Sequence, residues 1–136
     1  MKTLSVHQPW AHLIVTGVKN VENRTWYTQV RGTVLIHAGK KVDKAGLLWC
    51  RENGIALPAH LPTGGIVGQV DLVGMVGFAA DGVLEFTPDA ALDPATIENE
   101  VKRWHDRQCI GFVLRNAKPL PFKPLAGRLG FFEVQL

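Results

Sequence analysis

The chain has 136 residues and a formal net charge of +3, and 46% of its residues are hydrophobic and 20% charged. This size and composition predict one globular domain, residues 1–136, with a core of its own. No apolar run approaches the roughly 18 residues of a membrane-spanning helix, and the start lacks the apolar segment of a signal peptide, so we expect a cytoplasmic protein without membrane contact.

The first half of the chain alternates between strand and helix patterns. Pro9 suits a first helical turn, apolar residues follow at helical spacing, and Gly17 ends the pattern. Val21 is expected to point inward on the strand that follows, with its polar neighbours outward. The patterns predict a strand, a helix, two strands and a second helix over residues 2–6, 7–17, 20–26, 33–38 and 41–53.

The second half begins with a long strand at 66–78 that glycines interrupt, as at bulges or a barrel bend. Residues 79–92 are acidic and read as a loop. Asp93 and Pro94 suit the N-cap and first position of a third helix. Strands are predicted at 110–115 and at the end of the chain, and the proline-rich segment between them is expected to be an edge or a loop.

These elements come in mixed order, about six strands and three helices. Helices do not alternate regularly with strands, which argues against a doubly wound parallel sheet. The fold class expected is α+β, a domain built around a small curved sheet or barrel.

The charges fall into three blocks. Residues 1–51 carry eight basic and two acidic residues, residues 52–100 carry eight acidic and no basic residues, and residues 101–136 carry seven basic and two acidic residues. This order could give the folded molecule one positive face that attracts a polyanion, or the blocks could interleave into a mixed surface. The sequence leaves both open.

Common signatures of catalysis and cofactor binding are absent from the sequence, including GxSxG, the P-loop, HExxH and CxxC. Cys50 and Cys109 suggest neither a metal pair nor a disulfide framework. We therefore expect neither a metal nor a cofactor. The histidines also lack metal-ligand spacing, at His7, His12, His37, His60 and His105.

The segment GVKNVENRTW, residues 17–26, combines charges of both signs. On a strand, Glu22 and Arg24 face the same side, and Lys19 precedes them near the end of the helix. Facing solvent, they would form an ordinary charged surface. Facing a cleft, Glu22 could accept from an amino group while Lys19 and Arg24 hold a phosphate or polarise a carbonyl.

Aromatic and amide side chains flank that segment. Gln8 could point its amide into the same cleft, and Trp10 could serve the core or stack on a base. Trp26 and Tyr27 are neighbours on a strand, so they face opposite sides and one of them is expected to be exposed for stacking.

A second basic group follows at residues 31–41. Arg31 lies at a turn, and His37 ends a strand just before Lys40 and Lys41. This group could bind phosphate, or His37 could be a hydrogen-bonded core residue beside solvated lysines. Both interpretations stay open.

A resemblance to a known family adds to this interpretation. GVKNVENR, residues 17–24, matches the pattern G-x-K-x-x-E-x-R, the signature of the ASCH domain (activating signal cointegrator homology). LSVHQPWAHLIVTG, GGIVGQVDLVG and GFVLRNAKPLPFKPLAGRLGFFEV resemble its other blocks in order. The chain is identified as a small single-domain member of the bacterial or phage type.

The resemblance implies a PUA-like fold, a small mixed or antiparallel β-barrel flanked by about three helices. It also implies a nucleic-acid cleft beside the first helix, lined by Lys19, Glu22 and Arg24. Family members include coactivator modules, an amidohydrolase of acetylated cytidine and ribonucleases on single-stranded RNA. The amidohydrolase subgroup uses a Thr nucleophile three residues after the signature Lys, where this chain has Glu22, which argues against a covalent mechanism.

Three functions follow as hypotheses. The first is a nucleic-acid-binding module for RNA or a nucleotide, without a metal or cofactor. The second is a hydrolase in the same cleft, a ribonuclease or a nucleoside amidohydrolase, with Lys19, Glu22 and His37 as catalytic groups. The third is a coregulator-like module whose acidic segment 52–100 recruits a protein partner. Ligand contacts are expected from Gln8, Trp10, Lys19, Glu22, Arg24, Trp26, Arg31, His37 and Lys40.

Overall fold

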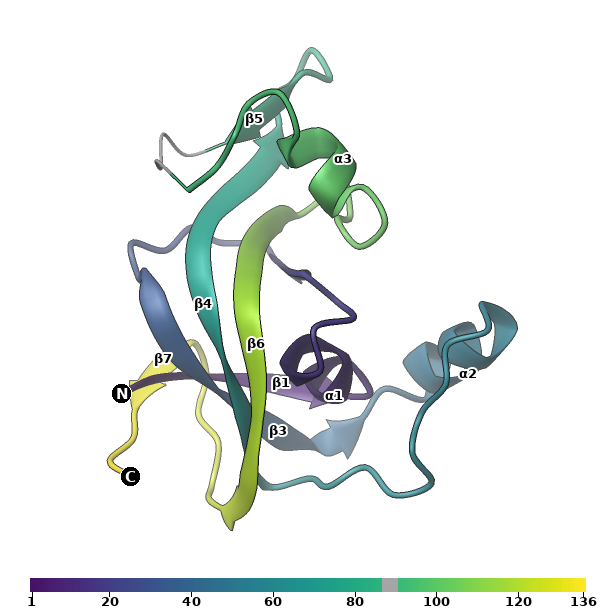
Figure 1. Cartoon of the computed structure of the whole chain (residues 1–136), viewed down its shortest axis with the longest axis vertical. Helices are drawn as coiled ribbons and strands as arrows, with labels where there is room; N and C mark the ends of the chain where they lie inside the picture. The colour runs from purple at the N-terminus through teal and green to yellow at the C-terminus, as the bar shows by residue number, and fades with distance from the viewer. Residues whose placement is uncertain (87–90) are drawn as a thin grey trace.

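The computed structural model describes residues 1–86 and 91–136 and contains one curved sheet with three helices (Figure 1). The predicted α+β class is confirmed. In chain order the elements are β1 (Lys2–Gln8), α1 (Trp10–Val15), β2 (Val21–Arg24), β3 (Gly32–Val42), α2 (Lys44–Glu52), β4 (Gly65–Phe78), β5 (Leu84–Phe86), α3 (Ile97–Val101), β6 (Ile110–Pro124) and β7 (Phe131–Glu133).

The seven strands form a mostly antiparallel sheet in the order β2-β6-β4-β3-β1-β7, with β5 paired to β4. Among the strand pairs of the described residues, only β1–β3 is parallel. The long strands β4 and β6 bend together through the middle of the molecule (Figure 1), and three register shifts interrupt their ladder. Within the described residues no ladder joins β2 to β7, so the sheet is curved like a barrel without being closed.

The proline-rich segment predicted as an edge or a loop is an edge. β6 continues through residues 116–124 on β4, but β2 pairs only with its first residues, Ile110 to Val113. Among the described residues, the other side of β6 has no strand partner beyond Leu114, whose amide donates to the carbonyl of Asn20. Prolines are tolerated there because no partner needs their missing N–H.

Two differences from the predictions lie between β4 and β6. Residues 84–86 lie in the predicted loop but form the short strand β5, which pairs with Val76–Phe78 of β4. The third helix was predicted to begin after Asp93 as N-cap, but α3 begins at Ile97. The Asp93 carboxylate accepts from the amide of Ala95, and its carbonyl from those of Thr96 and Ile97, so these residues form a turn that precedes the helix.

Helix α1 packs against the sheet and buries Ala11, Leu13, Ile14 and Val15. Its close approach to β4 depends on Gly68, because a Cβ there would lie 2.5 Å from Cγ1 of Val15. This contact fixes the end of α1, and therefore the segment 17–24, relative to the sheet. No helix in the described part of the chain is long and apolar enough to cross a membrane.

Candidate nucleic-acid interface

The C-terminal end of α1 turns the chain sharply into β2. Gly17 has a φ of +80°, and the amide of Lys19 then donates to the carbonyl of Leu13 at 2.9 Å. This turn holds the backbone of Lys19 against the last turn of α1. Strand alternation on β2 sends Val21 into the core and Glu22 and Arg24 to the opposite side, as predicted.

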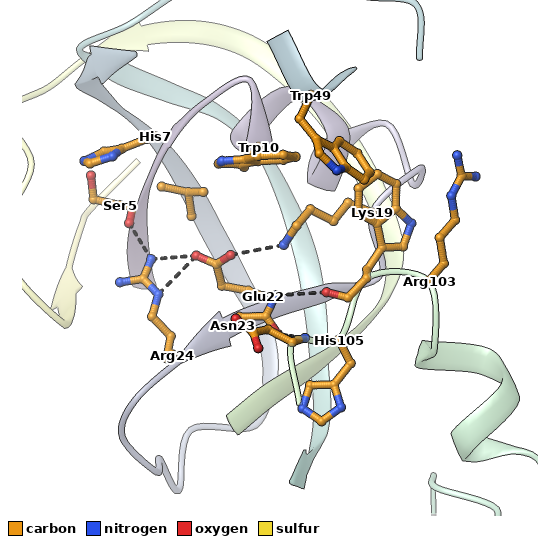
Figure 2. Close-up of a pocket in the computed structure, with 13 residues that line it drawn as sticks. Ser5, His7, Trp10, Lys19, Glu22, Asn23, Arg24, Trp49, Arg103 and His105 are labelled. Atoms are coloured by element: carbon orange, nitrogen blue, oxygen red, sulfur yellow. Dashed lines mark hydrogen bonds and ion pairs between the residues drawn. The ribbon is translucent and has the colours of Figure 1, made fainter. Parts of the chain in front are cut away.

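Lys19, Glu22 and Arg24 form the floor of a cavity of about 650 Å³ (Figure 2). Glu22 Oε2 accepts from Arg24 Nε at 3.0 Å and Nη2 at 2.8 Å, and Glu22 Oε1 lies 3.3 Å from Lys19 Nζ. Lys19 Nζ also donates to the carbonyl of Val21, and Arg24 Nη2 to that of Ser5 at 2.8 Å. The side chains of Lys19 and Glu22 are only 7% and 10% exposed, so this is not a solvated strand face.

Burial lowers the pKa of Lys19, and the charge of Arg24 lowers it further, while the Glu22 carboxylate opposes both. The cost of burying the ammonium therefore exceeds the stabilisation that Glu22 returns. An ammonium in this state gives up its proton more readily than a solvated one, and such a group is useful at a binding site.

We call this cavity the tryptophan pocket, because three tryptophans form one of its walls. Trp10 lies on α1, Trp49 on α2, and Trp104 in the turn after α3. The ring centroids of Trp10 and Trp49 are 6.0 Å apart, those of Trp10 and Trp104 6.5 Å, and those of Trp49 and Trp104 5.5 Å. Trp10 Nε1 donates to Asp43 Oδ2 at 2.9 Å, which fixes its ring. The guanidinium carbon of Arg103 lies 5.1 Å from the Trp104 ring centroid.

A second cavity of about 500 Å³ adjoins the first, and we call it the cationic pocket. Ser5, His7 and Arg24 line both cavities. The rest of its lining includes Lys40 and Lys41, the segment 125–130 and Arg128. No carboxylate side chain of the described residues lines the cationic pocket.

His37 lies at the base of the cationic pocket and is 1% exposed. Its Nε2 lies 2.6 Å from the carbonyl oxygen of Leu125 and its Nδ1 2.9 Å from the hydroxyl of Ser5. A carbonyl can only accept, so Nε2 donates, and in the neutral ring Nδ1 accepts from Ser5. Both ring nitrogens are occupied, so His37 acts on a ligand only through Ser5.

The structure divides the nine residues predicted to contact a ligand. Trp10, Lys19, Glu22 and Arg24 meet in the tryptophan pocket, and Arg24, His37 and Lys40 line the cationic pocket. The other three, Gln8, Trp26 and Arg31, line neither cavity.

Each of these three has partners elsewhere in the protein. Gln8 is 1% exposed, donates to the carbonyl of Pro62 and accepts from the amide of His12. Trp26 packs edge-on against Phe112 and Phe131, while its neighbour Tyr27 is the exposed one of the pair. Arg31 donates to the carbonyls of Thr28 and Val30.

Sequence reasoning missed several residues of the tryptophan pocket, chiefly His7, Trp49, Arg103 and Trp104. Trp49 and Trp104 lie on predicted helices, where apolar spacing indicates a core role. The adjacent basic and aromatic residues at 103–104 were the one local signal of a stacking surface, and that signal is weak without the fold.

The acidic residues of 52–100 lie away from both cavities, as far as the structure describes them. Glu100 pairs with Arg115 at 2.9 Å, and Asp71 accepts from Thr33 and Asn116. Asp89 lies outside the described residues. A protein partner for this segment stays a prediction. No group of three or more His, Cys, Asp or Glu side chains among the described residues could hold a metal ion.

Comparison with known proteins shows which family the chain belongs to. The sequence profile of the ASCH domain matches residues 4–115. The chain belongs to the ASCH domain family. This family has a PUA-like fold that is implicated in RNA binding. The matched residues include α1, β2 and the turn between them. The signature residues Lys19, Glu22 and Arg24, which were predicted from the sequence, therefore lie within the region that the family profile matches.

Two curated relatives are 41% identical over 78 residues, activating signal cointegrator 1 of Homo sapiens and of Mus musculus. The alignment covers 52% of this chain and 13% of each relative. Two mutant forms of the ASCH protein of Zymomonas mobilis share the fold, with TM-scores of 0.50 and identities of 16% and 17%. That likeness covers 91% of this chain and 73% and 75% of those chains.

Proposed function

We propose that this ASCH domain binds single-stranded RNA by taking one unstacked base into the tryptophan pocket. One observation carries the proposal: an aromatic wall of three tryptophans faces a buried Lys–Glu–Arg floor in a single open cavity. Single-stranded RNA presents base faces that stack on aromatic rings and base edges that need donors and acceptors. A volume of about 650 Å³ is within the range of small-ligand sites.

The floor offers groups of both kinds to a base edge. Lys19 has three N–H donors, and two of them are directed at the Val21 carbonyl and the Glu22 carboxylate. The third can serve a ligand. The Glu22 oxygens keep lone pairs beyond their contacts with Lys19 and Arg24. A base edge with one acceptor and one donor fits this floor.

The test is the affinity for a fluorescent single-stranded RNA, measured by anisotropy. Trp49 is 38% exposed and lines the pocket, whereas Tyr27 is an exposed aromatic residue outside it. Trp49→Ala should weaken binding by about tenfold or more, as expected for one lost stacking contact. Tyr27→Ala should bind like the parent. Equal losses for the two variants, or no binding of RNA by the parent, contradict the proposal.

Salt dependence tests the contribution of phosphate contacts. Basic side chains that neutralise phosphates release counterions, so the affinity should fall between about 50 and 200 mM salt. An affinity that does not change over this range would show that the RNA backbone is not contacted.

A hydrolase in the same cavity is the second candidate, and the state of Lys19 favours it. The ammonium is buried at the cavity floor beside Glu22, and burial lowers its pKa. Such a group can stabilise a developing negative charge or take part in proton transfer. Labelled RNA and acetylated cytidine are the substrates to test. If purified protein turns over either one and Lys19→Met stops turnover without unfolding, the hydrolase is supported; no turnover of either substrate rejects it.

A further inference from the structure

We propose that the cationic pocket binds a phosphate monoester, the terminal phosphate of a nucleotide or strand whose base occupies the tryptophan pocket. This inference rests on the proposed function and extends it from a base site to a nucleotide site. It assigns a ligand group to a cavity that the base-binding proposal leaves unused.

The charges around the cationic pocket favour an anion. Lys40, Lys41 and Arg128 line it, and none of the three makes an ion pair with a described residue. No carboxylate side chain of the described residues shares the lining. Like charges gathered at one concave surface raise the local potential and repel one another until an anion enters. Phosphate oxygens accept hydrogen bonds from lysine and arginine at such sites.

The base of the cationic pocket is held in place by hydrogen bonds. Ser5, His37 and the carbonyl of Leu125 form one chain of hydrogen bonds across β1, β3 and the segment after β6. The amide of Leu125 also donates to the carbonyl of Gly64 at 3.0 Å. Gly127 lies so close that a Cβ there would be 2.7 Å from Cε1 of His37. The segment that carries Arg128 is therefore fixed against the sheet.

Arg24 connects the two cavities. Its Nε and Nη2 bind Glu22 on the side of the tryptophan pocket, and its third nitrogen points away from Glu22 (Figure 2). Because Ser5, His7 and Arg24 line both cavities, one nucleotide can place its base in one and its phosphate in the other.

The number of cations favours a monoester over an internal phosphodiester. A phosphate monoester carries a charge of about −1.5 to −2 at neutral pH, whereas a diester carries one negative charge. Lys40, Lys41 and Arg128, which make no ion pair with a described residue, together with Arg24 match the larger charge better. The ligand class expected is a nucleoside monophosphate or a strand that ends in a phosphate.

The experiment compares ligands by calorimetry at pH 7.5. The probes are a nucleoside, its 5′- and 3′-monophosphates, and a dinucleoside joined by one phosphodiester. At least one monophosphate should bind the parent about tenfold or more tightly than the nucleoside and the diester do. The double variant Lys40→Ala/Lys41→Ala should lose that difference, and so should Arg128→Ala. The control variant Lys102→Ala/Lys118→Ala removes two positive charges at positions outside both cavities. It should keep the difference in affinity between the monophosphate and the other two ligands.

The outcomes separate this inference from the proposed function. If the nucleoside and RNA bind but neither monophosphate gains affinity, the phosphate site is rejected and the base site stands. If the diester gains as much as the monoesters, or the control variant loses as much as Lys40→Ala/Lys41→Ala, the monoester assignment is overturned. If no nucleoside, nucleotide or RNA binds, the proposed function and this inference both fail.

Discussion

Glu22 accepts two hydrogen bonds from Arg24 through a single carboxylate oxygen, at 3.0 Å from Nε and 2.8 Å from Nη2. Its second oxygen is thereby left to face Lys19 Nζ at 3.3 Å. One anion thus pairs with two cations at the floor of the tryptophan pocket, and the three residues together keep a net positive charge. The three charges of the ASCH signature act as one unit, in which the carboxylate allows the two cations to lie under an aromatic wall.

Glu22→Gln should therefore cost more stability than the loss of one surface ion pair. The variant leaves two largely buried cations without a counterion, which costs about 3 kcal/mol in comparable buried pairs. Urea unfolding at pH 7 measures the change in the free energy of unfolding.

Glu133→Gln is the matched control. Glu133 also pairs with two cations, the N-terminal ammonium and Lys2, but its side chain is 64% exposed. Its loss should cost much less than the loss of Glu22, because solvent and salt screen exposed ion pairs. Equal effects of Glu22→Gln and Glu133→Gln would show that burial does not decide the role of Glu22.

Asp43 supports both α2 and the tryptophan pocket. Its Oδ1 accepts from the amide of Gly46 as N-cap of α2, and its Oδ2 accepts from the indole of Trp10. Asp43→Ala should lower the free energy of unfolding at pH 7 by about 1–2 kcal/mol. It should also weaken RNA binding, because the Trp10 ring loses its anchor. Unchanged stability and affinity would contradict this double role.

The same contacts predict a pH dependence. The hydrogen bonds from Trp10 and Gly46 lower the pKa of Asp43 from its ordinary value of 3.8. The folded state then binds fewer protons than the unfolded state, so the stabilisation is complete above pH 3.8 and is lost as the pH falls through the folded-state pKa. The stability difference between the parent and Asp43→Asn should shrink in that acidic range. A difference that stays constant under acid would rule out this linkage.

Trp26 distinguishes a core role from a ligand role. Its ring centroid lies 5.3 Å from that of Phe112 and 5.9 Å from that of Phe131, and it lines neither cavity. Trp26→Ala should cost about 3 kcal/mol of stability, as core aromatic truncations do. The folded variant should keep the RNA affinity of the parent. A loss of RNA affinity without a change in the free energy of unfolding would indicate that Trp26 contacts the ligand and does not serve the core.

Gly127 tests whether the segment 125–130 shapes the cationic pocket. A Cβ at this position would lie 2.7 Å from Cε1 and 3.0 Å from Nδ1 of His37. The His37 ring cannot move aside easily, because hydrogen bonds at both of its nitrogens hold it in place. Gly127→Ala should therefore displace the segment, cost about 1–3 kcal/mol and weaken phosphate binding.

Gly77→Ala is the control for this substitution, because a Cβ at Gly77 would meet no atom within 4 Å. It should leave phosphate binding unchanged. If Gly127→Ala binds nucleoside monophosphates as the parent does, the segment has no part in shaping the pocket.

The sequence predicted the local geometry of the signature segment correctly. Helical spacing ends at Gly17, and strand alternation then sends Val21 inward and Glu22 and Arg24 to the opposite side. These features depend on backbone periods that neighbouring residues determine. The α+β class followed from the same periods. The ASCH resemblance could be read from the sequence because the motif residues are contiguous, and the family match over residues 4–115 confirms it.

Only the tertiary structure decided which side chains share a cavity. The wall of the tryptophan pocket joins residues 10, 49 and 104, and the cationic pocket joins residues 40–41 with 128. Gln8 and Trp26 are as polar or aromatic as the true lining residues, yet Gln8 is saturated by Pro62 and His12, and Trp26 is covered by β6 and β7. A side chain's partners depend on the elements that pack over it, and that packing is fixed by contacts between segments far apart in the chain.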